Sequence, residues 1–199
     1  MIAGNYYNKY ETTNPISGFL VGRFLRTIVD FAERCEPSTV HEVGCGEGML
    51  SSYVYNHLKH KPKRFSASDI SESIIDKARS RTQNTGIKFV VKSIYDLSQE
   101  ESSALIMCCE VLEHLKHPKA ALERLAEIAN DRIILSVPRE PVWRMLNLCR
   151  LKYIGDLGNT PGHIQHWSST SLICLVNKFF SIEDIAKPLP WTILLCKGR

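Results

Sequence analysis

The sequence predicts a single α/β domain built on a mostly parallel sheet with helices on both faces. Short apolar runs typical of strands alternate with stretches of helical periodicity, the order that gives parallel strands joined by crossover helices. The chain has 199 residues and 44% hydrophobic content, enough for one substantial core and too little for two ordinary domains. A glycine-rich turn also follows the first predicted strand, where a ligand can touch the backbone.

The predicted elements follow one another regularly along the chain. Apolar residues from Phe19 to Ala32 recur at helical spacing, and Pro37 closes this first helix. The elements expected after it are, in order, a first strand at 38–42, a second at 65–69, a helix at 71–81 with Ser71 as its N-cap, a third strand at 87–91, a fourth at 104–109, a helix at 119–128, a fifth strand at 132–137 and two late strands at 179–185 and 191–196.

The segment Pro138–Ser168 interrupts this pattern. It is rich in Gly, Pro, His and Arg, and we expect one short helix inside it, at Val142–Leu151. Long irregular segments in compact domains are usually functional or disordered. This one leaves the carboxyl end of the fifth strand, where open α/β sheets bind ligands, and is predicted to be a substrate-loop insertion.

The turn Glu42-Val43-Gly44-Cys45-Gly46-Glu47-Gly48 is the most informative motif of the chain. A dinucleotide fingerprint needs G-x-G-x-x-G, and Met49 occupies the third glycine position when counted from Gly44. The spacing therefore favours another nucleoside.

E-x-G-x-G-x-G after a first strand resembles motif I of the class I S-adenosylmethionine (SAM) dependent methyltransferases. Over roughly residues 38–199, the resemblance implies a three-layer Rossmann-like fold with seven strands, and SAM as the cofactor. In that family the first-strand acid and the glycine turn hold the amino acid end of SAM. The corresponding residues here are Glu42, Gly44, Cys45 and Gly46.

The next two strand ends provide candidates for the nucleoside. Asp69 can accept hydrogen bonds from both ribose hydroxyls, with Ile70 beside it, and the resemblance gives the same role to an acid here. The alternative is that Asp69 caps the following helix, although Ser71 is better placed to do so. Ser93 stands where family members often carry an acid, so we expect adenine contacts from Ser93 and the Ile94 backbone, with Asp96 as a surface residue.

The run Cys108-Cys109-Glu110-Val111-Leu112-Glu113-His114-Leu115 resembles the fourth motif of the Methyltransf_11 and ubiquinone-biosynthesis O-methyltransferase branch. In that branch a strand ends beside the SAM methyl group, which places Cys109 and Glu110 at the cofactor. On a helix, Glu110, Glu113 and His114 would share one face.

Glu113 and His114 are either structural or substrate-side polar groups or, with a loop histidine, ligands of a divalent ion. The small-RNA terminal 2′-O-methyltransferases use a similar E-x-x-E-H arrangement. Because the motif also occurs in relatives with no metal, we predict no metal site.

The loop histidines His163 and His166 and the motif residue His114 are the catalytic candidates. A histidine can take a proton from a hydroxyl or an amine as the methyl group arrives. In an extended segment His163 and His166 would point to opposite faces, so only one can easily reach the methyl group. The alternative is that both brace the loop against the core.

The same loop and the N-terminus supply the predicted substrate contacts: Arg139, Arg144, Trp167, Tyr6 and Tyr10. The arginines, with Arg150 and Lys152, could orient an anionic substrate by bidentate contacts, although a solvated basic helix face is the commoner explanation. In related methyltransferases the segment before the first helix folds over the SAM pocket. We therefore expect a lid segment and first helix at 1–37 and the methyltransferase domain at 38–199; the alternative is a tail that stays disordered until ligand binds.

Composition narrows the partners and the compartment. Seven cysteines without a C-x-x-C pair argue against a disulfide framework and a structural zinc, and fit a reducing cytosol. The N-terminus lacks a signal-peptide pattern and no apolar run could span a bilayer, so we expect a cytoplasmic protein. The net charge of +4 does not argue for nucleic acid.

The sequence thus predicts a SAM-dependent methyltransferase that methylates an oxygen of a small molecule or a modified peptide, with a carboxylate as one candidate acceptor. The alternatives are a metal-dependent RNA 2′-O-methyltransferase and a SAM-binding module without activity. The sequence does not indicate the oligomeric state.

Overall fold

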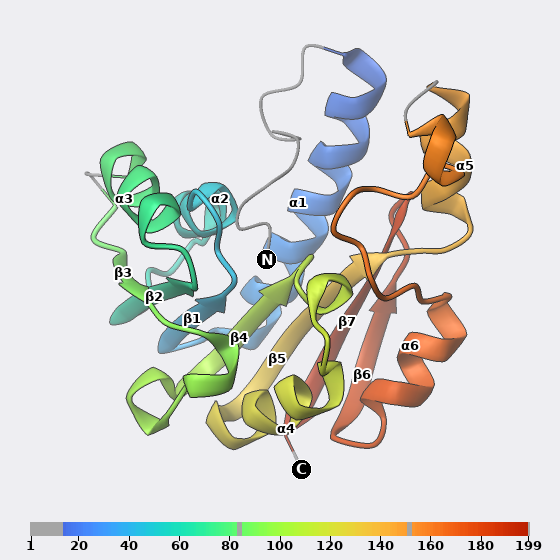
Figure 1. The fold of residues 1–199 in the computed structure, drawn as a ribbon. Helices are drawn as coiled ribbons and strands as arrows, with labels where there is room; N and C mark the ends of the chain where they lie inside the picture. The colour runs from blue at the N-terminus through green and yellow to red at the C-terminus, as the bar shows by residue number, and fades with distance from the viewer. Residues whose placement is uncertain (1–13, 83–84, 151–152, 199) are drawn as a thin grey trace.

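The computed structural model describes residues 14–82, 85–150 and 153–198. They form three layers, with a seven-stranded sheet between two layers of helices (Figure 1). The strands are β1 (Thr39–Val43), β2 (Arg64–Asp69), β3 (Lys88–Val91), β4 (Ser103–Cys109), β5 (Ala129–Pro138), β6 (Phe180–Ala186) and β7 (Trp191–Gly198). Their order is β3-β2-β1-β4-β5-β7-β6, and β7 runs antiparallel to both of its neighbours. The predicted α/β class with a mostly parallel sheet is confirmed.

Helices cover both faces of the sheet. The α-helices are α1 (Pro15–Cys35), α2 (Met49–His57), α3 (Glu72–Arg81), α4 (Pro118–Ile128), α5 (Val142–Cys149) and α6 (Ser169–Val176), and short 3-10 turns are η2 (Ile94–Asp96), η3 (Gln99–Glu101), η4 (Leu112–His114) and η5 (Ile154–Asp156). Successive side chains of β4 point to opposite faces. Met107 packs in one core cluster with α1 and α2, whereas Ile106 packs in another with α4 and α6.

Helix α1 is longer than predicted, because its N-terminus is well capped. Asn14 Oδ1 accepts hydrogen bonds from the backbone N–H groups of Ile16 and Ser17, and Pro15 occupies the first helical turn. The helix packs in the main core rather than apart from it, and the ring centroids of Phe24 and Trp191 lie 4.8 Å apart. No helix in the described part of the chain is long and apolar enough to cross a membrane.

Helices α2 and α6 are not predicted by the sequence. They have 9 and 8 residues, and polar residues such as Ser51 and Thr170 interrupt their apolar spacing. The N-terminus of α2 matters for the site, because the glycine turn leads directly into its first residue. Helix α5 and the loop after it extend beyond the carboxyl ends of the strands (Figure 1).

Candidate cofactor and acceptor site

The glycine turn after β1 is held by backbone hydrogen bonds to the end of β2. Gly44 N–H and Cys45 N–H donate to the Ser68 carbonyl at 2.8 and 3.0 Å. Gly44 has φ of 71°, the left-handed region that favours glycine. A β-carbon at Gly44 would lie 2.4 Å from Val111 Cγ2, so the turn also packs against the segment that follows β4.

Residues on either side of this turn tie it to α2. Glu42, at the end of β1, is 2% exposed and accepts a hydrogen bond from Ser51 Oγ of α2. Gly48 is the N-cap residue of α2, with φ of 75°. The first helical N–H groups therefore begin directly beside the turn, where they favour an anionic ligand group.

The Asp69 carboxylate links the glycine turn to α3. Its Oδ2 accepts from Gly46 N–H at 3.0 Å and its Oδ1 from Ser71 N–H at 3.1 Å. Ser71 is the N-cap residue of α3, as predicted, but its side chain makes no capping hydrogen bond, and its own amide donates to Asp69. Each carboxylate oxygen keeps a second acceptor position, so the predicted ribose contact remains a prediction.

The other predicted nucleoside residues lie at the same edge of the sheet. Ile70 is 51% exposed next to Asp69. Ser93 Oγ accepts from Tyr95 N–H at 3.3 Å and caps η2, while the Ile94 side chain is buried in the core. Asp96 is exposed at the end of η2, as expected of a surface residue. The adenine contacts stay predictions.

The segment after β4 is not the regular helix that the E-x-x-E-H spacing suggested. Glu110 has φ of 62° and its N–H donates to the Ser136 carbonyl at 3.0 Å. Its Oε2 accepts from Trp191 Nε1 at 2.7 Å. The expectation that Glu110, Glu113 and His114 share a helix face is therefore wrong, because the 3-10 turn begins only after Glu110.

Glu113 and His114 instead meet the loop that carries His163. The Glu113 carbonyl accepts from Ile164 N–H and Gln165 N–H at 2.9 and 3.0 Å. His114 Nδ1 lies 2.9 Å from the Gly162 carbonyl, and since a carbonyl can only accept, Nδ1 carries the proton and Nε2 keeps a lone pair. The rings of His114 and His163 have centroids 4.9 Å apart.

Glu113, His114 and His163 can also be considered as metal ligands. One ligand atom from each lies within 4.8 Å of the others, with Glu113 buried and His114 exposed. A carboxylate and two imidazoles suit ions such as Mn²⁺ or Fe²⁺, and a ligating histidine usually donates its other N–H to a carbonyl, as His114 does to Gly162. Glu113, His114 and His163 therefore fit such an ion. Glu110 is not part of this group, and its carboxylate accepts a hydrogen bond from Trp191.

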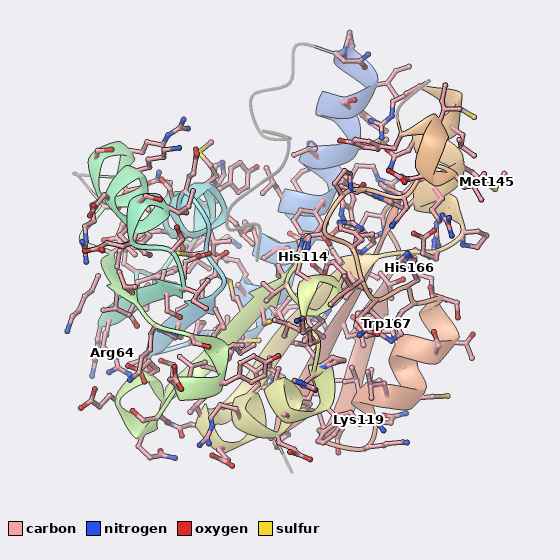
Figure 2. All side chains as sticks on the ribbon, viewed as in Figure 1. Arg64, His114, Lys119, Met145, His166 and Trp167 are labelled. Carbon is pink, nitrogen blue, oxygen red and sulfur yellow. The ribbon has the colours of Figure 1, made fainter. Side chains whose placement is uncertain are left out.

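Figure 2 shows His114 near the carboxyl edge of the sheet. It also shows His166 and Trp167, which follow His163 in the later loop. His166 is exposed and lies outside the Glu113–His114–His163 group. The Trp167 carbonyl accepts from Glu140 N–H at 2.9 Å. Tyr6, Tyr10 and Lys152 lie outside the described residues.

Helix α5 holds the loop from the other side, through residues that the sequence did not single out. Trp143 Nε1 donates to Thr160 Oγ1 at 2.9 Å, and its ring stacks 5.9 Å from that of His163. Asn147, 2% exposed, donates to the Gly158 carbonyl at 2.9 Å. Arg144, predicted to bind substrate, donates to the loop carbonyls of Leu157 and Asp156. No motif marks Trp143 or Asn147; only their burial and contacts identify them.

Several groups near the turn have perturbed pKa values because they are buried. Burial lowers the pKa of His41 to about 4, and its ring lies between Ser66 Oγ and Ser68 Oγ at 2.8 and 3.0 Å. Burial also raises the pKa of the Cys45 and Cys109 thiols well above the usual value. These thiols stay protonated at neutral pH and are not nucleophiles.

Comparison with known proteins agrees with this geometry. A family model described as "Methyltransferase domain" matches residues 40–131. A ubiquinone biosynthesis O-methyltransferase from Xanthomonas axonopodis pv. citri is 26% identical, over 79% of this chain and 70% of that protein. A malonyl-[acyl-carrier protein] O-methyltransferase from Anoxybacillus flavithermus is 29% identical, over 48% of this chain and 36% of that protein.

Solved structures share the fold. Magnesium protoporphyrin IX methyltransferase from Synechocystis PCC 6803 superposes with a TM-score of 0.73 and 21% identity, covering 96% of this chain and 91% of that one. The methyltransferase domain of bacterial CtHen1-CN gives a TM-score of 0.69 and 20% identity, covering 89% of this chain and 99% of that one.

The sheet order, with its antiparallel β7 and a glycine turn after β1, defines a Rossmann-like fold, and open α/β sheets of this kind bind ligands at the carboxyl edge. The matched family model indicates a methyltransferase domain at residues 40–131, and the named relatives to which the chain is similar are methyltransferases.

Proposed function

We propose that this enzyme transfers the SAM methyl group to an oxygen of a small-molecule or modified-peptide acceptor. The observation that carries the proposal is the convergence of three segments. Gly44 of the glycine turn packs on Val111, and two residues later Glu113 and His114 hold the loop of His163 by hydrogen bonds. Similarity to relatives named as O-methyltransferases supports oxygen as the acceptor atom.

In this proposal the turn and strand ends bind the cofactor. Glu42, Gly44, Cys45 and Gly46 contact the amino acid end, Asp69 and Ile70 the ribose, and Ser93 and Ile94 the adenine. Cys109 and Glu110 lie at the methyl group, which the bound cofactor offers on a sulfonium. The protein must also orient the acceptor oxygen, exclude water and, for a hydroxyl acceptor, accept its proton.

The proton of a phenol or alcohol acceptor goes to a histidine of the His114–His163 pair. His114 Nε2 has the available lone pair, because Nδ1–H is bound to the Gly162 carbonyl. His163 is held beside it by the Trp143 ring and by the loop hydrogen bonds. His166, exposed and outside the pair, is the weaker candidate. A carboxylate acceptor is already ionised at neutral pH and needs no base.

The loop that carries His163 between α5 and α6, described over residues 153–168, is called the acceptor loop, and the surface around it favours an organic acceptor with apolar parts. Met145, Leu157 and Ile164 are 60%, 69% and 51% exposed, and Met145 points away from α5 into solvent (Figure 2).

A metal-dependent RNA 2′-O-methyltransferase is the second candidate. The Glu113–His114–His163 group favours it, because those donors lie close enough to share one ion. An ion there would act on the acceptor hydroxyl in place of a histidine base. A SAM-binding module without activity is the third candidate.

Cofactor binding is tested by thermal shift with S-adenosylhomocysteine, which must raise the melting temperature if it binds the native state. Asp69→Ala should weaken this shift, because two backbone amides and the ribose lose their acceptor. Asp76→Ala on α3, which removes a surface ion pair to Arg79, is the matched control. An equal shift in wild type and Asp69→Ala would contradict the ribose assignment.

The acceptor class is tested by methyl transfer from labelled SAM to phenols, carboxylic acids and a short RNA, with and without EDTA. Activity on a small molecule that survives EDTA and is lost in His114→Ala or His163→Ala is the expected result for a hydroxyl acceptor. Activity confined to RNA and abolished by EDTA would replace this proposal with the second candidate. Mn²⁺ binding followed by electron paramagnetic resonance then reports the ion directly, and His163→Ala should abolish it.

A further inference from the structure

We infer that Arg139 forms an anion subsite beside the acceptor position, so that the acceptor carries a carboxylate or a phosphate group. The inference rests on the proposed function, because it names the chemical class of the same enzyme's acceptor. Among the basic residues around the acceptor loop, Arg139 alone is assigned this role.

The backbone of Arg139 is fixed on three sides. Its N–H donates to the Pro190 carbonyl at 2.8 Å, and its carbonyl accepts from Trp143 N–H at 2.9 Å. An isolated parallel bridge joins it to Trp167. Arg139 therefore starts from a rigid position one residue beyond β5, between β7 and the acceptor loop.

Strand alternation places the Arg139 side chain on the face of the sheet that meets the loop. Arg139 continues the series of Leu135 and Val137, which pack in the core cluster with Leu112 of η4. Trp167 packs against the same cluster. The guanidinium thus lies on the side of β5 where η4 and the loop meet.

The Arg139 guanidinium lacks the partners that the other arginines of the loop have. Its Nε is buried and has no hydrogen-bond partner among the described residues. Arg144 donates to the carbonyls of Leu157 and Asp156, and Arg150 to the Leu146 carbonyl and Asn147 Oδ1. Arg144 thus joins α5 to the loop and Arg150 bonds within α5, which leaves Arg139, among these three described arginines, as the cation that can serve a ligand.

The neighbouring acid does not neutralise Arg139. Glu140 follows it in the chain, and its carboxylate accepts from Arg144 N–H at 3.4 Å. Buried donors in native proteins are nearly always satisfied, and a buried unpaired donor is best explained by a missing partner. A guanidinium presents parallel N–H groups that match the two oxygens of a carboxylate or a phosphate.

The test is calorimetric titration of the protein with 3,4-dihydroxybenzoate, phenyl phosphate and catechol, with and without saturating S-adenosylhomocysteine. One of the two anions should bind wild type roughly tenfold more tightly than catechol, as a charge-assisted bidentate contact implies. Arg139→Gln should remove the preference, and Arg139→Lys should keep part of it. Arg124→Gln, at a surface ion pair with Glu127 on α4, should leave it unchanged.

The preferred anion distinguishes a carboxylate acceptor from a phosphate one. If neither anion binds wild type better than catechol, or if folded Arg139→Gln keeps the preference, the subsite does not exist. Failure of S-adenosylhomocysteine to bind would count against the proposed function instead, and the titrations without it still report on Arg139. Melting temperatures of the variants show that each is folded.

Discussion

At the scale of single residues, Gly44 lacks a side chain for two separate reasons. Its φ of 71° strains any residue with a β-carbon, and a β-carbon there would lie 2.4 Å from Val111 Cγ2. Gly18 in α1 is the opposite case, since a β-carbon at Gly18 would meet no atom within 4 Å. Substitution by alanine is therefore expected to have opposite effects on stability at Gly44 and at Gly18.

Gly44→Ala should lower the free energy of unfolding by about 1–3 kcal/mol, from backbone strain and overpacking. It should also weaken S-adenosylhomocysteine binding, because the turn must shift. Gly18→Ala should be neutral or stabilise by about 0.5–1 kcal/mol, as alanine in a helix interior does. Urea unfolding of both variants measures the difference. Equal effects would show that the turn tolerates a side chain, and adding Val111→Ala to Gly44→Ala should recover only the steric part.

Single residues also show where sequence reasoning stops. The spacing of Gly44, Gly46 and Gly48 is visible in the sequence, because a positive φ restricts the residue type locally. The carboxylate of Asp69 accepts from Gly46 N–H and that of Glu110 accepts from Trp191 Nε1, and both donors are distant in the chain. No local pattern encodes such contacts.

At the scale of elements, the acceptor loop and α5 act as one unit joined at Thr160. This residue is buried, and its Oγ1 accepts from Trp143 Nε1 at 2.9 Å and from Asn147 Nδ2 at 3.3 Å. Trp143 in turn stacks on His163. The position of His163 therefore depends on a hydroxyl three residues earlier.

Thr160→Val keeps the size of the side chain and removes the shared acceptor. It should cost about 1–3 kcal/mol of stability, because the half-buried Trp143 Nε1 loses its acceptor and Asn147 Nδ2 keeps only the Gly158 carbonyl. Methyl transfer should fall roughly ten- to a hundredfold through misplacement of His163, while S-adenosylhomocysteine affinity stays unchanged. Hydrogen exchange should speed up across 158–166. Thr27→Val in α1, whose hydroxyl bonds only to the Arg23 carbonyl, is the control; unchanged exchange and turnover in Thr160→Val would contradict the coupling.

Elements differ in how far the sequence reveals them. Strands such as β4 and β5 are buried on both faces, so their apolar runs are continuous and were predicted to within a few residues. Helices α2 and α6 are short and were missed, since their stability comes from packing rather than from periodicity. The E-x-x-E-H spacing is compatible with a helix face, yet Leu112–His114 form a 3-10 turn, because spacing alone does not distinguish the two.

At the scale of the whole molecule, Trp191 connects the two late strands to the cofactor edge. It pairs with Pro138 in the antiparallel register of β5 and β7. Its ring lies 4.8 Å from Phe24 of α1 and 6.0 Å from Trp143 of α5, and its Nε1 donates to Glu110. The alternation of elements predicts a parallel sheet, but the insertion of β7 between β5 and β6 rests on such long-range pairing, which the sequence alone does not show.

Trp191→Phe keeps an aromatic ring against Phe24 and Trp143 and removes only the donor to Glu110. It should lower the free energy of unfolding by about 1.5–3 kcal/mol, the range for a hydrogen bond to a charged group. If Glu110 is then released from its position at the end of β4, S-adenosylhomocysteine affinity should fall as well. A double-mutant cycle with Glu110→Ala isolates the bond, and a coupling of about 0.5–3 kcal/mol is expected for groups in direct contact. Additive effects on stability would mean that the two residues act independently, and that Glu110 is positioned by its backbone bond to Ser136 rather than by the antiparallel strand.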